Sequence, residues 1–323
     1  MKRILIISFF VLALLLLLFL LVRTPDLPID ELKQRYTNPA SQFVTIAGMQ
    51  VHYRDEGPRT DPLPILLLHG TASSLHTWDS LVPLLPQKRC IRLDLPGYGL
   101  TGPHPEANYF SGTYAAVFDT LLQKLEVDSC LVGGNSLGGF LAWTYALHNP
   151  AVKGLVLIDA GGFSIGKGSS SNLGFRLARI PGVNQLMKHI TPAALFRKSL
   201  EQSFGDAQQV TQALVQRHYE LTLRPGNRQA LLDRFSKGFE VADTNRLRQL
   251  QIPALVLWGR LDRIIPVEHA LLFQQYLPVN QTIIYDDLGH VPMEEDGHRT
   301  AAAISNWLQQ YHLIKPLPAL GFE

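Results

Sequence analysis

The sequence predicts an α/β fold in which helices cover both faces of a mostly parallel sheet. Six short apolar runs recur along the chain and are separated by segments of helical length: "ILLLH", "CIRLD", "SCLVGG", "GLVLID", "ALVLWG" and "TIIYD". Runs that are hydrophobic on both faces are typical of buried parallel strands. The chain has 323 residues, of which 46% are hydrophobic and 17% charged, and this is enough for one large domain with a sizeable core.

The chain begins with a long apolar segment, Ile4 to Val22, whose only polar residue is Ser8. A helix of this length would reach roughly 28 Å, close to the hydrocarbon thickness of about 30 Å. Lys2 and Arg3 precede it, which favours a cytoplasmic N-terminus. A cleaved signal peptide is the alternative, but its apolar region normally has about 7–15 residues and ends at a small-x-small site. We therefore expect residues 1–23 to be an uncleaved membrane anchor, with the body on the non-cytoplasmic, periplasmic side.

The rest of the chain divides into three kinds of segment. A proline-containing linker leaves the anchor, and a hairpin turning at Ala47-Gly48-Met49 opens the core. About 90 residues between "GLVLIDA" and "IPALVLWG" have helical spacing without a strand pattern, and they begin with the flexible "GGFSIGKGSSSNLG". We expect a helical cap there. The expected boundaries are a linker at 24–41, the first part of the core at 42–160, the cap at 161–251 and the second part of the core at 252–323.

The charge pattern excludes one class of partner. The formal net charge is +2, and Lys2, Arg3 and Arg23 of the N-terminal segment carry three of the positive charges, so the remainder is close to neutral. No basic stripe indicates nucleic-acid binding. The expected partners are a small-molecule ester or acyl substrate and, through the N-terminal helix, a membrane.

The stretch "GGNSLGG" places glycines around Ser136 at a junction between a predicted strand and a predicted helix. It contains G-x-S-x-G, from Gly134 to Gly138. In such a tight turn the flanking positions require glycine, and the serine hydroxyl projects out of the sheet. The amide of Leu137 points into the same space at a helix N-terminus, where an oxyanion is favoured. Ser136 is therefore the expected nucleophile.

A serine hydroxyl needs a base, and that base needs an acid to orient it. His290 lies in "DDLGHVPMEE", in the loop after the last predicted strand, and Asp262 lies in "WGRLDRIIP", just past the preceding one. Asp159 in "LIDAGG" also follows a strand and is a second candidate for the acid. We favour Asp262, because adjacent loops after neighbouring strands can meet. For the second oxyanion donor, the amide of Thr71 in "HGTASS" is the choice.

With these motifs the sequence resembles the α/β-hydrolase superfamily over roughly residues 44–313. The matching stretches are "LLLHGTASSLHTWDSLVPLL", "RLDLPGYGLTG", "GGNSLGG", "LVLWGRLDRIIP" and "LGHVPMEE". The order Ser136, Asp262, His290 is the one expected for this superfamily. Within the superfamily, these motifs most resemble those of cap-bearing serine esterases and carbon–carbon-bond hydrolases.

The resemblance implies an eight-stranded, mostly parallel sheet with the triad at its carboxyl edge and a helical cap after the sixth strand. It also implies that the strand at 65–69 separates those carrying Cys90 and Cys130, so that no disulfide joins them. Relatives often have serine at the position of Thr101, and Asp94 in the same loop is expected to anchor it. Superfamily members with an aspartate nucleophile, the haloalkane dehalogenases and epoxide hydrolases, are excluded by Ser136.

The expected function is that of a membrane-anchored serine hydrolase, of the carboxylesterase or lipase type, with no cofactor and no metal. Carbon–carbon-bond hydrolysis by the same triad is an alternative. A non-enzymatic protein that binds a small apolar ligand under the cap is another, although a pure binder has no need of a strained serine. The apolar content of "LGFRLARIPGVNQLM" and "AALFRKSL" in the cap hints at an acyl-sized pocket.

Overall fold

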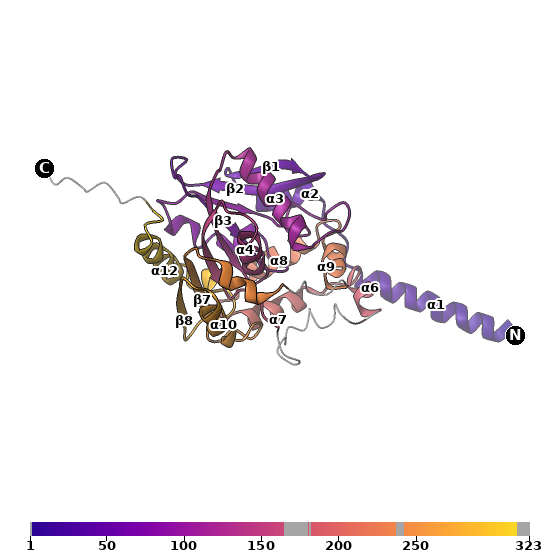
Figure 1. The fold of residues 1–323 in the computed structure, drawn as a ribbon. Coiled ribbons are helices and arrows are strands. Elements are labelled where there is room, and N and C mark those ends of the chain that lie inside the picture. The colour runs from indigo at the N-terminus through magenta and orange to yellow at the C-terminus, as the bar shows by residue number, and fades with distance from the viewer. Residues whose placement is uncertain (1, 165–179, 181, 237–241, 315–323) are drawn as a thin grey trace.

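The computed structural model describes residues 2–164, 180, 182–236 and 242–314, and an eight-stranded sheet lies at its centre (Figure 1). The strand order is β1-β2-β4-β3-β5-β6-β7-β8. β2 pairs antiparallel with β1 and with β4, and all other pairs are parallel. The strands are β1 (Ser41–Ile46), β2 (Met49–Glu56), β3 (Ile65–Leu68), β4 (Cys90–Leu93), β5 (Cys130–Asn135), β6 (Val152–Ile158), β7 (Ala254–Gly259) and β8 (Asn280–Tyr285). The predicted eight-stranded, mostly parallel sheet is confirmed.

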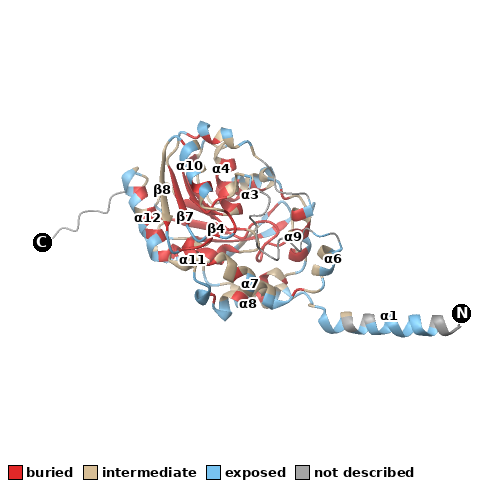
Figure 2. Ribbon diagram, turned by 90° about the horizontal axis from the view of Figure 1, so that it is seen from below, coloured by how far each residue is buried: buried red, intermediate tan, exposed pale blue. Residues whose placement is uncertain are grey.

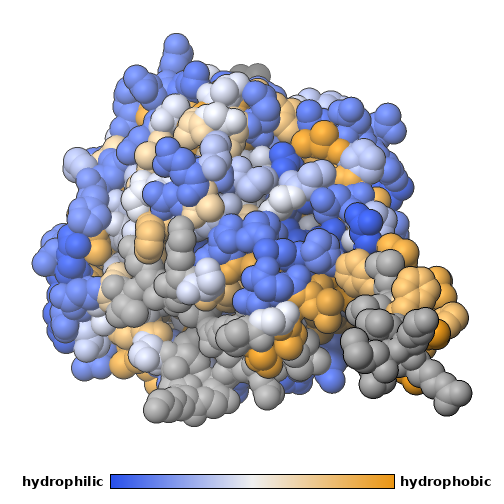
Figure 3. All heavy atoms as spheres, turned by 90° about the vertical axis from the view of Figure 1, so that its right-hand side faces the viewer, coloured by the Kyte–Doolittle hydropathy of each residue, from blue (hydrophilic) through white to orange (hydrophobic). Residues whose placement is uncertain are grey.

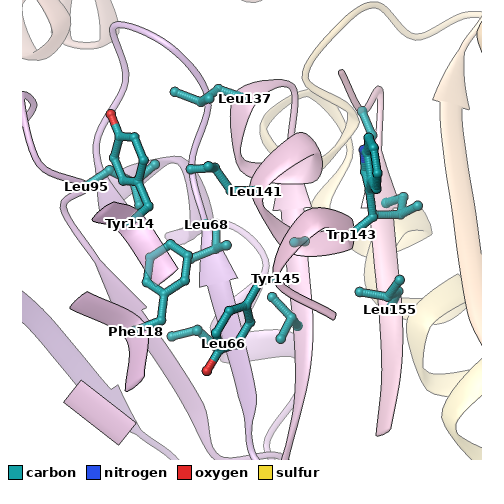
Figure 4. Close-up of a cluster of buried hydrophobic side chains, with 14 of the residues drawn as sticks. Leu66, Leu68, Leu95, Tyr114, Phe118, Leu137, Leu141, Trp143, Tyr145 and Leu155 are labelled. Carbon is teal, nitrogen blue, oxygen red and sulfur yellow. The ribbon is translucent and has the colours of Figure 1, made fainter. Parts of the chain in front are cut away.

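The two faces of the sheet carry separate apolar layers, because alternate residues of a strand point to opposite sides. Leu66 and Leu68 of β3 belong to one layer, with α3 (Ser111–Lys124), α4 (Leu137–Ala146) and α10 (Glu268–Tyr276). Figure 4 shows the packing of this layer, with Tyr114 and Phe118 of α3 close to β3 and with α4 beside them.

The opposite layer joins Ile65 and Leu67 of β3 to Ile304 and Trp307 of α12 (Gly297–Gln310). With helices over both faces, the strands lie in a buried central band (Figure 2). Such burial explains why the strands read as continuous apolar runs.

The hairpin and the cysteines lie as the sequence predicted. Ala47 and Gly48 join β1 to β2, and both have positive φ, 48° and 76°, as a two-residue hairpin turn of type I′ requires. Cys90 on β4 and Cys130 on β5 flank the central strand β3 and are free and buried. Burial raises the pKa of each thiol to about 12, so both remain protonated and unreactive at neutral pH.

The interval between β6 and β7 contains only helices among its described residues. They are α6 (Val183–Met187), α7 (Ala193–Ser203), η3 (Ala207–Gln209), α8 (Gln212–Thr222), α9 (Asn227–Ser236) and η4 (Thr244–Gln249). The segment 165–179, which holds most of the predicted flexible start of the cap and much of the "LGFRLARIPGVNQLM" stripe, lies outside the described residues.

The N-terminal helix α1 (Lys2–Val22) projects from the body and does not pack on the sheet (Figures 1 and 2). Its described side chains include Ile7 at 63% and Leu21 at 72% exposure. In the described part of the chain, which leaves out the side chains of residues 2–5, 12, 15, 16 and 18 of α1, no helix is long and apolar enough to cross a membrane. The membrane anchor stays a prediction.

The segment after α1 is more ordered than a linker. It contains the helix α2 (Ile29–Tyr36), which starts after Pro28 and has Asp30 and Glu31 in its first turn. Leu32 of this helix is fully buried against Leu221 of α8, so residues 24–41 dock on the cap. Acidic residues in the first turn and basic residues in the last stabilise such a short helix through its dipole.

Candidate active site

Ser136 lies at the junction of β5 and α4, with φ 55° and ψ −113°. This conformation is rare for a residue with a side chain and marks stored backbone strain. A Cβ at Gly134 would overlap the backbone of Gly138, and a Cβ at Gly138 would overlap the carbonyl of Leu68. Only glycine therefore allows the turn to close this tightly. Ser136 is partly accessible, whereas Asn135 and Leu137 on either side of it are buried.

His290 and Asp262 meet in a buried hydrogen bond. Nδ1 of His290 lies 2.7 Å from Oδ2 of Asp262, and both residues are less than 10% exposed. The other oxygen of Asp262, Oδ1, accepts the backbone N–H groups of Ile264 at 2.7 Å and Ile265 at 3.0 Å. With Nδ1 directed to the carboxylate, Nε2 is left to exchange protons with a nucleophile. The structure thus places His290 in contact with Asp262, which lies 28 residues earlier in the sequence.

Asp159 lies in the same buried layer but plays a different part. Its Oδ1 accepts the N–H of Gly259 at 3.0 Å, and its φ is 43°. Burial, followed by the negative charge of Asp262, raises the pKa of Asp159 well above its usual value. We interpret Asp159 as a neutral carboxyl group that supports the ends of β6 and β7, with Asp262 carrying the negative charge.

Three donor atoms, from Asp159, Asp262 and His290, lie within 4.8 Å of one another, a spacing that could hold a metal ion. The bonding pattern fits proton transfer better. Nδ1 of His290 and Oδ2 of Asp262 are committed to each other, and the remaining oxygen of Asp262 is taken by two amides. A metal would have to break the buried pair that orients the imidazole.

The expected oxyanion donors flank the nucleophile. Leu137 is the first residue of α4, so its N–H has no partner inside the helix. The loop that carries Thr71 approaches closely, since a Cβ at Gly70 would lie 3.2 Å from Cβ of Ser136. Within the described residues the Thr71 amide donates to no other backbone group. Both amides are thus available to a negative oxygen near Ser136.

Two further residues hold the His290 loop, and the sequence analysis did not single out either. Nδ2 of Asn135 donates to the carbonyls of His290 at 2.9 Å and Ile158 at 3.2 Å, so the residue before the nucleophile ties the base loop to the sheet. Glu295 accepts the amides of Gly289 and Gly205, each at 2.7 Å. The sequence signal for Glu295 was the acidic "MEED" run, which begins three residues after His290.

The cap reaches the same loop through the end of α7. The N–H of His290 donates to the carbonyl of Ser203 at 2.7 Å. Gly205 and Gly289 pack so tightly that a Cβ on either would overlap the other segment's backbone. The cap is therefore fastened to the base loop by backbone contacts and by the Glu295 carboxylate.

Asp94 organises the loop after β4. Its carboxylate accepts the amides of Leu75 and Leu100, each at 2.8 Å, and lies 2.7 Å from Nδ1 of His52. Burial alone would raise the pKa of Asp94, but the neighbouring histidines, His52 first and then His76 and His69, together hold that pKa well below its usual range. Thr101 donates to the Asp94 carbonyl at 2.7 Å. The Thr101 hydroxyl thus helps to hold the loop that Asp94 anchors.

The comparison with known families rests on the same stretches. The family model for the alpha/beta hydrolase fold matches residues 64–297, which is more than half of the chain. The chain belongs to the α/β hydrolase fold family. It is a hydrolase of this type, and the resemblance described from the motifs is confirmed.

Several known proteins are similar to this α/β hydrolase. It is 28% identical over 282 residues to an uncharacterised protein of Mycobacterium tuberculosis, covering 81% of this chain and 79% of that protein. It is 26% identical over 260 residues to the 2-hydroxy-6-oxo-2,4-heptadienoate hydrolase of Pseudomonas putida, covering 77% and 89%.

Solved structures give the same fold. A membrane phospholipase A described as a bacterial virulence factor superposes with a TM-score of 0.73 at 25% identity, covering 97% of this chain and 99% of that one. A meta-cleavage product hydrolase superposes with a TM-score of 0.72 at 22% identity, covering 84% and 98%, and shows the shared fold.

Proposed function

We propose that this α/β hydrolase cleaves carboxylic esters through an acyl-enzyme formed on Ser136, and that its N-terminal helix holds it at a membrane. The observation that carries the proposal is the buried 2.7 Å contact between His290 and Asp262, in a loop that is bonded to Asn135, the residue before the positive-φ serine. A buried carboxylate fixes the tautomer of the imidazole and stabilises the imidazolium that forms during catalysis.

The reaction proceeds in two halves. Nε2 of His290 takes the hydroxyl proton of Ser136 while Oγ attacks the ester carbonyl, and the amides of Leu137 and Thr71 stabilise the resulting oxyanion. The tetrahedral intermediate then collapses, the C–O bond breaks, and the alcohol leaves with the proton from His290. In the second half His290 takes a proton from water as the water oxygen attacks the acyl carbon. The bond from that carbon to Ser136 Oγ then breaks, Oγ takes the proton back from His290, and the carboxylic acid leaves.

The extent of the structural match supports ester cleavage at a membrane. The match to the membrane phospholipase A covers 97% of this chain, whereas the match to the meta-cleavage product hydrolase covers 84%. The apolar segment Ile4–Val22 and the exposed apolar side chains of α1 support an anchor. Figure 3 faces the side from which α1 projects and shows hydrophobic residues gathered in its lower part.

Carbon–carbon-bond hydrolysis is the second candidate. It is favoured by the relatives named as hydrolases of 2-hydroxy-6-oxo-dienoates and 2-hydroxymuconate semialdehyde, which are 24–26% identical to this chain. The same triad can serve that reaction, because both reactions begin with an attack on a carbonyl group or with proton transfer next to it.

Three measurements separate the candidates. A fluorophosphonate probe should label the full-length detergent-solubilised protein and should fail to label Ser136→Ala. If the wild-type protein is not labelled, a non-enzymatic binder would be favoured. A panel of p-nitrophenyl esters of rising chain length should then show turnover that depends on acyl length. Consumption of a 2-hydroxy-6-oxo-dienoate with kcat/KM far above that of every ester would overturn ester cleavage in favour of carbon–carbon-bond hydrolysis.

A further inference from the structure

A small cavity, lined by both polar and apolar residues, lies between the oxyanion-side loop and the cap. Its walls come from the loop at 72–74, the turn at 97–99, helix α8 and the start of α9. The volume within which the centre of a water molecule can lie is about 10 Å³. This volume suits one water molecule or one hydroxyl group of a larger molecule.

Four side chains that line this cavity each carry a buried polar atom with no hydrogen-bond partner among the described residues. The atoms are Ser73 Oγ, Tyr98 Oη, His218 Nε2 and Asn227 Oδ1. Tyr98 and Asn227 are only 5% and 3% exposed. Buried polar groups are almost always paired in folded proteins, so four of them around one cavity indicate a ligand group that pairs with them.

The other bonds of these side chains define what the cavity offers. Nδ1 of His218 donates to the carbonyl of Ala72 at 3.1 Å, and burial lowers the pKa of His218 to about 3, so the ring is neutral and Nε2 is an acceptor. Both donor positions of Asn227 Nδ2 are used, by Gly99 O at 3.0 Å and Leu221 O at 2.8 Å, which leaves Oδ1 as an acceptor.

The hydroxyls of Ser73 and Tyr98 can donate or accept. Two fixed acceptors and two adaptable hydroxyls suit a neutral group that both donates and accepts. A carboxylate or phosphate oxygen could accept no hydrogen bond from His218 Nε2 or Asn227 Oδ1, because both atoms are themselves acceptors.

The cavity adjoins the reaction centre through the oxyanion loop. Ala72, which lines it, follows Thr71 directly and has a φ of 58°, a conformation that the hydrogen bond from His218 helps to hold. Burial raises the pKa of Tyr98, and the charge of Arg234 and then the nearby Thr71 hydroxyl act against that rise, which places Tyr98 next to Thr71. A group bound here would therefore lie beside the amide expected to hold the oxyanion.

We propose that the cavity is a subsite for a hydroxyl group on the alcohol part of the substrate, so that the preferred substrates are monoesters of polyols such as glycerol. The proposal rests on the ester cleavage proposed above. A simple fatty acyl chain carries no hydroxyl, whereas a polyol keeps at least one free hydroxyl near the ester bond. A site that hydrogen-bonds a substrate hydroxyl discriminates strongly against an analogue without it, because its polar atoms are then left unpaired.

The test compares two esters of one acyl chain, 1-decanoylglycerol and propyl decanoate, at matched concentrations in the same detergent. We expect wild-type kcat/KM to favour the glycerol ester by at least about tenfold. The double variant Ser73→Ala/Tyr98→Phe removes two of the hydroxyls and keeps the aromatic ring that packs edge-on against His69. It should bring the ratio of the two kcat/KM values to within about threefold, because the variant loses more activity on the glycerol ester than on propyl decanoate.

Tyr114→Phe is the matched control, since it removes a buried phenol that donates to Pro96 O outside the cavity, and the wild-type ratio should persist. Equal wild-type rates on the two esters would overturn the subsite and leave ester cleavage standing, with the cavity holding water alone. A wild-type protein that hydrolyses neither ester would reject ester cleavage and the subsite with it. The wild-type comparison decides the proposal even where the double variant does not fold.

Discussion

A carboxyl oxygen of Asp159 lies within 4.8 Å of a carboxyl oxygen of Asp262, in the buried layer beneath His290. Two ionised carboxylates so close in a buried site repel each other, and one of them keeps its proton. Asp262 accepts two amides and contacts His290, whereas Asp159 accepts one amide, so the proton belongs on Asp159. This division of roles distinguishes Asp262, the acid that the sequence analysis favoured, from Asp159, its second candidate.

Exchanging each acid for its amide should expose the difference. Asp262→Asn should lower kcat on a p-nitrophenyl ester by on the order of 10⁴, because the amide cannot hold the imidazole in the required tautomer. Asp159→Asn should cost about tenfold or less, since an amide resembles the neutral carboxyl that it replaces. Circular dichroism checks that both variants fold. Near-normal turnover in Asp262→Asn, with a folded but inactive Asp159→Asn, would reverse the assignment.

The raised pKa of Asp159 also predicts how stability depends on pH. The folded protein binds this proton more tightly than the unfolded chain, whose aspartates titrate near about 3.9. The contribution of Asp159 is therefore fully present below that pH and is lost as the pH rises through the raised pKa. Urea unfolding from pH 4 to pH 9 should show a smaller loss of stability in Asp159→Asn than in wild type. Parallel curves for the two proteins would show that Asp159 is ionised in the fold.

Ser136→Ala should leave a folded protein with esterase activity at background. The variant removes only the hydroxyl oxygen, and the glycines at 134 and 138 that permit the turn remain. The measurements are ester turnover and the thermal unfolding midpoint of purified protein. More than a few per cent of wild-type turnover would mean that another residue is the nucleophile.

Glu295→Gln should loosen the base loop. The carboxylate accepts two amides, from Gly205 and Gly289, and a glutamine can accept only one of them while its NH₂ opposes the other. We expect a loss of about 1–3 kcal/mol in unfolding free energy, with a fall in kcat because His290 is one residue from Gly289. Glu268→Gln, an exposed change at the start of α10, is the control and should match wild type in both measurements. A Glu295→Gln protein as stable and active as this control would show that the Glu295 carboxylate does not support the His290 loop.

Removal of the N-terminal helix tests the anchor. Full-length protein should remain in the membrane fraction after an alkaline carbonate wash, and a chain beginning at Arg23 should be soluble and active. The truncation keeps Thr24 and Leu27, which are bonded to His189 and Leu223 of the cap, and Asp26, which pairs with Arg228. Recovery of a mature N-terminus near residue 24 from native membranes would instead identify a cleaved signal peptide.

The sequence predicted those features that leave a local pattern. Apolar runs located the six parallel strands, and the glycines around Ser136 located the turn between β5 and α4. The residues at 262 and 290 were found because each follows a strand, and parallel strands end at one edge of the sheet.

Contacts between distant segments left no such pattern. The bond from His218 to Ala72 spans 146 residues, and the bond from Asn135 to His290 spans 155, so nothing near either residue announces its partner. The helix α2 was missed for another reason. Its eight residues follow two prolines, Pro25 and Pro28, and were taken for a linker, although the acidic first turn and basic last turn of "IDELKQRY" indicate a helix.

The left-handed backbone at Ser136 makes the residue that is best for stability different from the residue that the reaction needs. Glycine adopts that φ without a steric penalty, so Ser136→Gly is expected to unfold at a higher temperature than Ser136→Ala. Selection for thermal stability alone, without a test of activity, would therefore favour Ser136→Gly, which lacks the hydroxyl. At this one position the fold would tolerate glycine best, and only the demands of the reaction account for a serine there.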